Sequence, residues 1–181
     1  MSEYAAFLRG INVGRAHRVS SAELRECFEE LGLREVSTFR SSGNVAFAAG
    51  RERGAELCAR IEKGLESSLG YEVAVFLRSA GEVRAIAAQD PFPAAAVEAS
   101  RGKLQVAMLS RKPTAKARRA VLALATEEDR LAFGEQELFW LPSAGTQESR
   151  LDFKPIDKLL GRTTVRTMGT VEQMAAKYFG A

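Results

Sequence analysis

The sequence predicts an α+β protein built from two tandem ferredoxin-like units, each with the order β-α-β-β-α-β and a mainly antiparallel sheet. The first observation is that short apolar runs and amphipathic segments follow one another in this order through the first half of the chain. The second is that the order starts again after a segment with two prolines at residues 90–100. We therefore expect an N-terminal unit with a linking helix at residues 1–89 and a C-terminal unit at residues 101–181.

Short apolar runs in the first half are the expected strands, and they lie at residues 4–9, 36–40, 45–48 and 73–77. The first helix begins with Ser20 and Glu23, which form an S-x-x-E capping box, and Gly32 is a suitable residue for its end. The second helix carries a stripe of apolar residues spaced four apart, and Gly70 ends it.

The same signals continue into the second half. Ser79 and Glu82 form another capping box, and Pro91 and Pro93 stop that helix, so residues 90–100 are the expected linker. The strands of the second unit are expected at residues 104–109, 130–133, 138–141 and 163–166. Its helices are expected at residues 114–124, at residues 152–160 and around residues 171–178.

The composition is that of an ordinary globular protein. Of the 181 residues, 46% are hydrophobic and 27% are charged, so a core forms without a metal or a disulfide. One histidine, His17, and two distant cysteines, Cys27 and Cys58, are too few for a zinc site, so we expect no metal and no cofactor. The apolar run at the start is short and broken by Arg9, so we expect a cytoplasmic protein with no membrane segment.

The first candidate site follows from the predicted topology. The loop after the first strand and the turn between the second and third strands lie at the same end of the sheet, where the first helix also points its N-terminus. Glycine lets the backbone approach a ligand, and arginine binds phosphate or carboxylate through two hydrogen bonds. The alternative is a glycine-containing loop with solvated arginines. The residues expected to bind an anion here are Arg9, Gly10, Asn12, Gly14, Arg15, Arg18, Arg40, Ser42 and Asn44.

A second polar cluster is expected at the opposite end of the second unit. The loop before the helix at residues 152–160 and the end of the last strand should meet there, and their hydroxyls and arginines suit an anion. The alternative is a set of helix caps and turn residues. The residues of this cluster are Ser149, Arg150, Arg166 and Thr170.

Positive charge gathers in residues 101–119, which contain Lys and Arg but no Asp or Glu. The net charge of the whole chain is only +3, so this excess is local. Such a stretch attracts phosphate-bearing partners, although a solvated basic face is the plainer interpretation.

Several short motifs together resemble the bacterial domain-of-unknown-function 1697 family. They are LRGINVG at 8–14, SGNV at 42–45, DPFP at 90–93, LSRKP at 109–113 and TTVRTMGTV at 163–171. The resemblance implies a cytoplasmic α+β protein built from ferredoxin-like halves, and it implies no established activity. The chain departs from the usual family pattern at Ser41, where the family has Gln, and at 167–169, where it has Asn-Trp-Asn.

Three functions fit these observations. The first is binding of a small anionic ligand, phosphorylated or nucleotide-like, at the loop after the first strand, with or without a reaction. The second is nucleic-acid binding through the basic stretch at residues 101–119, which should weaken steeply with salt. The third is a protein-interaction scaffold that uses the DPFP segment or Trp140 as a contact.

Overall fold

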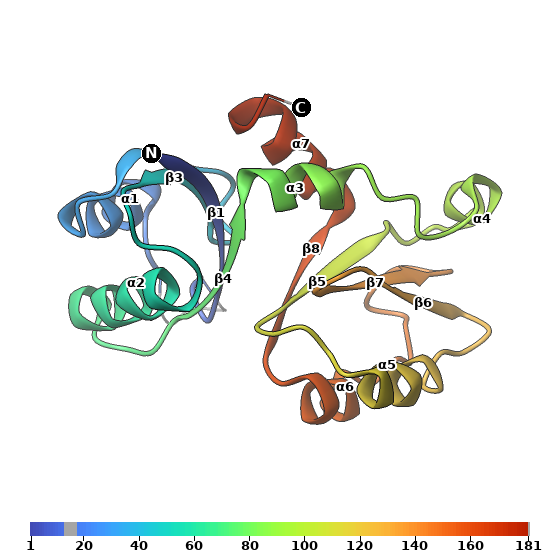
Figure 1. Ribbon diagram of the computed structural model, residues 1–181. Coiled ribbons are helices and arrows are strands. Elements are labelled where there is room, and N and C mark those ends of the chain that lie inside the picture. Colours follow the sequence, from blue (N-terminus) through green and yellow to red (C-terminus); the bar gives the residue numbers. More distant parts are fainter. Residues whose placement is uncertain (13–17, 181) are drawn as a thin grey trace. The chain divides into compact units, whose positions relative to one another are not determined.

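The computed structural model describes residues 1–12 and 18–180 and confirms the predicted α+β fold, with two four-stranded antiparallel sheets (Figure 1). The chain forms two compact units. Unit 1 comprises Met1–Ala85 with Met174–Ala181, and unit 2 comprises Ile86–Gln173. Each unit carries its own sheet and its own helices, in the order expected of a ferredoxin-like unit.

Unit 1 has the strand order β2-β3-β1-β4. Its strands are β1 (Ser2–Arg9), β2 (Arg34–Thr38), β3 (Asn44–Ala49) and β4 (Ala74–Ser79). Its helices are α1 (Ser21–Glu30), α2 (Gly54–Leu69) and the start of α3 (Ala80–Ala87). Strand β1 pairs with β3 on one side and with β4 on the other, so the middle of the sheet is fully hydrogen-bonded.

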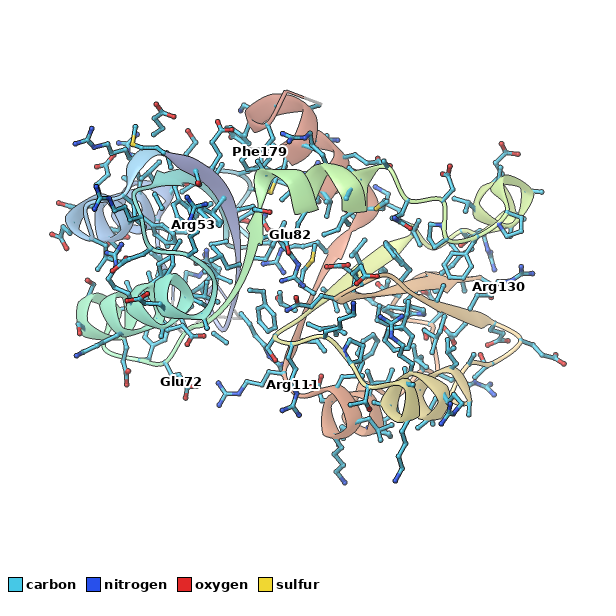
Figure 2. All side chains as sticks on the ribbon, in the orientation of Figure 1. Arg53, Glu72, Glu82, Arg111, Arg130 and Phe179 are labelled. Atoms are coloured by element: carbon cyan, nitrogen blue, oxygen red, sulfur yellow. The ribbon has the colours of Figure 1, made fainter. Side chains whose placement is uncertain are left out.

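Helices α1 and α2 cover one face of this sheet (Figure 1). Phe28 of α1 packs edge-on against Phe47 of β3 with ring centroids 5.4 Å apart, and Leu57 and Ile61 of α2 are completely buried. Burial of one such side chain stabilises the fold by about 1.5–3 kcal/mol. Side chains fill the layer between these helices and the sheet (Figure 2).

The capping residues named from the sequence hold the helix starts. Ser20 Oγ accepts a hydrogen bond from the Glu23 N–H at 3.1 Å, and Glu23 Oε2 accepts one from the Ser20 N–H at 2.8 Å. Ser79 and Glu82 form the same reciprocal pair at the junction of β4 and α3. Satisfying these end groups fixes where the chain turns from strand to helix.

Unit 2 repeats the arrangement with the strand order β6-β7-β5-β8. Its strands are β5 (Gln105–Leu109), β6 (Asp129–Phe133), β7 (Glu137–Pro142) and β8 (Thr163–Thr167). Its helices are α4 (Ala94–Ala99), α5 (Ala115–Leu122), α6 (Phe153–Leu160) and the start of α7 (Met168–Tyr178). Helices α5 and α6 cover one face of the sheet, over a core that includes Leu109, Leu138 and Ile156.

The segment expected to be a plain linker contains the short helix α4. Pro93 precedes its first residue, and the sequence AAAVEA consists mostly of strong helix formers. None of its residues is buried, so packing adds little to its stability. A six-residue helix is too short to show the apolar stripe that marks longer helices, so hydrophobic periodicity does not predict it.

The last residues of the chain belong to unit 1, whereas the sequence assigns the whole of 101–181 to the second half. Tyr178 contacts Phe39 edge-on at a centroid distance of 6.1 Å, and its hydroxyl donates to the Thr38 carbonyl at 3.4 Å. Arg84 Nη1 donates to the Phe179 carbonyl at 2.9 Å. These contacts explain why helix α7 ends in the unit that began the chain.

Across the described residues, no helix combines the length and the apolar character that crossing a bilayer requires.

Both cysteines are free. Cys58 donates to the Val75 carbonyl at 3.2 Å, and burial raises the pKa of its thiol to about 11. Burial also raises the pKa of Cys27.

The raised pKa of Cys58 predicts an unreactive thiol. At pH 8 only about one part in a thousand is thiolate, so alkylation by iodoacetamide should be about 100-fold slower in the folded protein than in guanidinium chloride. Mass spectrometry of the peptides after timed quenching measures both rates. Equal rates in the folded and unfolded protein would contradict the burial of this residue.

Candidate functional site

A cleft of about 670 Å³ lies at the N-terminus of α1, between the loop after β1 and the turn between β2 and β3. We call it the α1 cleft. Its lining from the first segment includes Asn12, Arg18 and Ser20, and its lining from the turn includes Arg40 and Ser41. The structure therefore brings together the two segments that the predicted topology placed at one end of the sheet.

Asn12 ties these two segments to each other. Its Nδ2 donates to the Ser41 carbonyl at 2.7 Å, and its Oδ1 accepts from the Val19 N–H at 2.8 Å. Its backbone has a φ of 52°, in the left-handed region that asparagine tolerates better than most residues. One side chain thus fixes the loop against both the turn and the segment that leads into α1.

Hydrogen bonds from β1 and from Asn44 hold the turn at Ser41–Asn44. The Gly43 carbonyl accepts from the Leu8 N–H at 2.8 Å, and Gly43 has a φ of 76°. The buried side chain of Asn44 donates to the Phe39 carbonyl at 2.8 Å and to Ser42 Oγ at 3.0 Å. Asn44 and Ser42 therefore use these polar groups to shape the turn beneath the α1 cleft.

The start of α1 supplies backbone donors to the cleft. Capping satisfies the N–H of Glu23, while those of Ser21 and Ala22 have no acceptor among the described residues. Glu23 is the only residue with a carboxylate among the described residues of the lining. Hydrogen bonding to Ser20, through its side chain first and its backbone second, lowers the pKa of Glu23, so this group is charged at neutral pH.

Two arginines border the cleft. Arg18 is exposed and has no hydrogen bond or ion pair with any described residue. Arg40 has a φ of 58°, and its guanidinium carbon lies 5.4 Å from the centroid of the Phe39 ring. Both side chains are exposed, and guanidinium groups bind anions through several N–H donors.

Other predicted residues lie elsewhere. Leu8 packs into the core under α1 and α2, so its neighbour Arg9 points to the opposite face of the sheet and does not line the cleft. A Cβ on Gly10 would lie 3.6 Å from the Glu72 carbonyl, so that glycine approaches the segment before β4. Gly14 and Arg15 fall within 13–17, outside the described residues.

The second predicted cluster is not gathered into one place. Ser149 Oγ donates to Asp129 Oδ1 at 2.7 Å, and Trp140 Nε1 donates to the same oxygen at 2.7 Å. Asp129 lies on β6, at one edge of the sheet, whereas Arg166 lies on β8, at the other edge. Arg150 is exposed, and Thr170 Oγ1 lies 2.9 Å from Thr167 Oγ1.

Trp140 and Arg166 also lie on different faces of the unit 2 sheet. Trp140 packs edge-on against Phe153 at 5.1 Å, on the face covered by α6. Val165 packs into the core under α5 and α6, so its neighbour Arg166 points to the opposite face. Burial lowers the pKa of Arg166 to about 10, which still leaves it charged at neutral pH.

Arg78 of β4 is the counterpart of Arg166 in unit 1, and the sequence-based candidates did not include it. Arg78 is only 2% exposed. Arg78 Nη1 donates to the Leu77 carbonyl at 2.8 Å, and Arg166 Nη1 donates to the Val165 carbonyl at 2.8 Å. A signal was present, because LRSAGEV at 77–83 and VRTMGTV at 165–171 share the pattern R-[ST]-x-G-x-V. Each unit therefore has a buried arginine as the penultimate residue of its fourth strand, two residues before a helix begins.

Part of the basic stretch is used inside unit 2. Arg118 Nη2 donates to the carbonyls of Gly134 at 2.8 Å and Glu135 at 3.0 Å, and its guanidinium lies over the Phe133 ring. Lys112 forms an ion pair with Glu135. These contacts stabilise the β6–β7 turn, so the charge free to attract a nucleic acid is smaller than the sequence suggests.

Comparisons with known proteins place the chain among uncharacterised relatives. A family model described as "Protein of unknown function (DUF1697)" matches residues 1–139. The structure of the conserved bacterial protein SP0830 from Streptococcus pneumoniae is similar, with a TM-score of 0.76 and 23% identity over 98% of this chain and 99% of that chain. At that identity the likeness shows a shared fold. No curated protein matches the chain.

The turn beneath the cleft predicts a specific cost for Gly43→Ala. A Cβ there would lie 2.7 Å from Ile11 Cδ1 and 3.0 Å from Leu8 Cβ, in addition to the strain of a positive φ. We expect a loss of about 2–4 kcal/mol in the free energy of unfolding, measured with urea. Gly32→Ala is the matched control, because Gly32 has a φ of 74° and open space around it, and it should cost only about 1 kcal/mol. Equal losses would contradict the close approach at Gly43.

The two side-chain hydrogen bonds of Asn12 and its positive φ predict different losses of stability for two substitutions. Asn12→Gly keeps the backbone conformation but removes both side-chain hydrogen bonds, and it should lower the free energy of unfolding by about 1–2 kcal/mol. Asn12→Ala adds backbone strain and should cost about 1 kcal/mol more. Urea unfolding of both variants separates the two contributions. Wild-type stability in Asn12→Gly would show that the loop does not depend on these bonds.

Proposed function

Because the chain belongs to the family described as protein of unknown function (DUF1697), whose description names no ligand, we propose from the site itself that the α1 cleft binds a small anionic ligand, phosphorylated or nucleotide-like. The observation that carries the proposal is the pair Arg18 and Arg40, which approach one cleft from two separate segments at a helix N-terminus. A cytoplasmic location is part of the proposal and is supported by two free cysteines.

Charge and donors in the cleft suit an anion with several oxygens. Arg18 offers a guanidinium with no partner in the described chain, and Ser21, which lines the cleft, offers a backbone N–H at the positive end of the α1 dipole. The hydroxyl of Ser41 is a further donor along the turn. A volume of about 670 Å³ is within the range of small-molecule sites.

Glu23 sets a limit on this attraction. Its carboxylate is charged and lies in the lining, so it repels an anion near the helix start while it caps the helix. It is the only carboxylate among the described lining residues, and the capping box occupies it. The geometry therefore supports binding of an anion more directly than a proton-transfer reaction on it.

The test is a thermal-shift and calorimetry series with inorganic phosphate, glucose 6-phosphate and ADP, with adenosine as the uncharged comparison. At 100 times its dissociation constant a ligand stabilises by about 2.7 kcal/mol, which is about 5–10 °C for a chain of this size. We expect a shift with at least one phosphorylated probe and none with adenosine.

The variants decide the location of binding. Arg18→Ala and Arg40→Asn should each weaken binding of the phosphorylated probe about tenfold, and asparagine tolerates the positive φ at position 40. Arg51→Ala is the matched control, since Arg51 is exposed beyond β3, at the other end of the sheet. Unchanged affinity in both cleft variants, or an equal loss in Arg51→Ala, would disprove the proposal.

Glu23→Gln provides a test in the opposite direction. Glutamine at this position still completes a capping box, so stability should hold while the negative charge is removed. Calorimetry should show binding of the phosphorylated probe several-fold tighter than in the wild-type protein. Weaker binding in this variant would mean that the anion does not approach α1.

A further inference from the structure

A separate pocket of about 730 Å³ lies within unit 2, bounded by residues 89–98 and by the residues where β5 and α7 begin. Its volume falls in the usual range of small-molecule sites. Its walls are mainly apolar and are formed by Pro91, Phe92, Pro93, Val97, Leu104 and Met168. The DPFP motif of the sequence, which the α1 cleft does not involve, thus forms one wall of a pocket.

The charge of this pocket is entirely negative. Asp90, Glu98 and Glu172 contribute to its lining, which includes no Lys or Arg among the described residues, although the whole chain has 26 basic and 23 acidic residues. None of the three carboxylates has a hydrogen bond or an ion pair with a described residue. Three unpaired carboxylates around an apolar floor create a potential that attracts cations.

The spacing of the carboxylates argues against a metal ion. Nowhere in the described chain are three His, Cys, Asp or Glu side chains close enough together to hold one. Separated carboxylates around an apolar pocket suit an organic cation. The charged group of such a ligand pairs with a carboxylate, while its apolar body is buried in the pocket.

The walls are held in place before any ligand arrives. The Met168 N–H donates to the Leu104 carbonyl at 2.8 Å, which fixes the starts of α7 and β5 to each other. Pro91 and Pro93 restrict the backbone of the lining segment at residues 89–98 and have no N–H, so they present no backbone donor to the pocket. Phe92 is half-buried, and an aromatic ring of this kind also attracts a cation over its face.

We propose that this pocket binds a small organic cation, an amine carried on an apolar body, with its charge beside Asp90, Glu98 and Glu172 and its body against Phe92, Val97 and Leu104. The choice of occupant rests on charge complementarity: an apolar floor excludes a strongly hydrated ion, and an all-acidic rim excludes an anion. This site is independent of the α1 cleft, which belongs to unit 1.

Three probes that share one apolar body test the proposal on the full chain: 4-phenylbutylamine, 4-phenylbutanol and 4-phenylbutyrate. Ligand-detected NMR titrations to about 10 mM cover weak binding. We expect saturable binding of the amine, about tenfold weaker binding of the alcohol and no saturable binding of the acid. Equal binding of all three probes, or no binding of the amine, would overturn the proposal. Binding of a lysine-rich peptide without binding of the amine would overturn it in favour of a protein partner.

Variants assign the binding to this pocket. Glu98→Gln and Glu172→Gln should each weaken binding of the amine about two- to fivefold and leave that of the alcohol unchanged, because only the charged contact is lost. Glu66→Gln is the matched control, an exposed carboxylate on α2 with no partner among the described residues. Unchanged affinity of the amine in the Glu98→Gln/Glu172→Gln double variant would place the amine elsewhere and refute the assignment.

Discussion

The position of the first strand in the middle of each sheet is the constraint on which the rest of the structure depends. Strand β1 is hydrogen-bonded on both sides, and β5 is its counterpart in unit 2. A central strand cannot shift its register without exposing one buried face, so the loop that follows it leaves from a fixed point. In unit 1 that point is secured by the bond from the Leu8 N–H to the Gly43 carbonyl. The α1 cleft exists because this bond and Asn12 hold the loop and the turn together.

Much of this arrangement could be predicted from local signals. Capping boxes such as Ser20 with Glu23 fix helix starts through a few neighbouring residues, and the antiparallel order then places the loop and the turn at one end. What could not be predicted is where each side chain points. Asn44 faces into its own turn, and Arg9 points to the face of the sheet opposite α1 and α2, because strand alternation and local hydrogen bonds decide direction. The second cluster separates for the same reason: alternate residues of a strand face opposite sides of a sheet.

The two buried arginines occupy the same position in both units, which the amino-acid composition alone does not show. Arg78 and Arg166 each donate to the carbonyl of the preceding residue, directly before a hydroxyl residue that caps the next helix. A buried guanidinium left unsatisfied would cost several kcal/mol, so its neighbours must be placed to accept its hydrogen bonds. The repeated R-[ST]-x-G-x-V pattern is therefore a constraint on the junction of strand and helix, and it is the clearest trace in the sequence that the two units share one plan.

That shared plan makes the differences between the units informative. The bond from the Leu109 N–H to the Gln136 carbonyl is the unit 2 counterpart of the bond between Leu8 and Gly43. There, however, Arg118 donates across to the turn and Lys112 pairs with Glu135, so two of the basic side chains at this end make contacts within unit 2.

In unit 1 the equivalent end keeps Arg18 without a partner in the described chain, on the lining of the α1 cleft. The same topology thus carries different contacts in the two units: Arg118 and Lys112 bind within unit 2, whereas Arg18 lines a cleft in unit 1. Topology alone cannot account for that difference, since it is common to both units. The α1 cleft is set apart by the residues on its lining, and those residues are the ones whose charge an anion would complement.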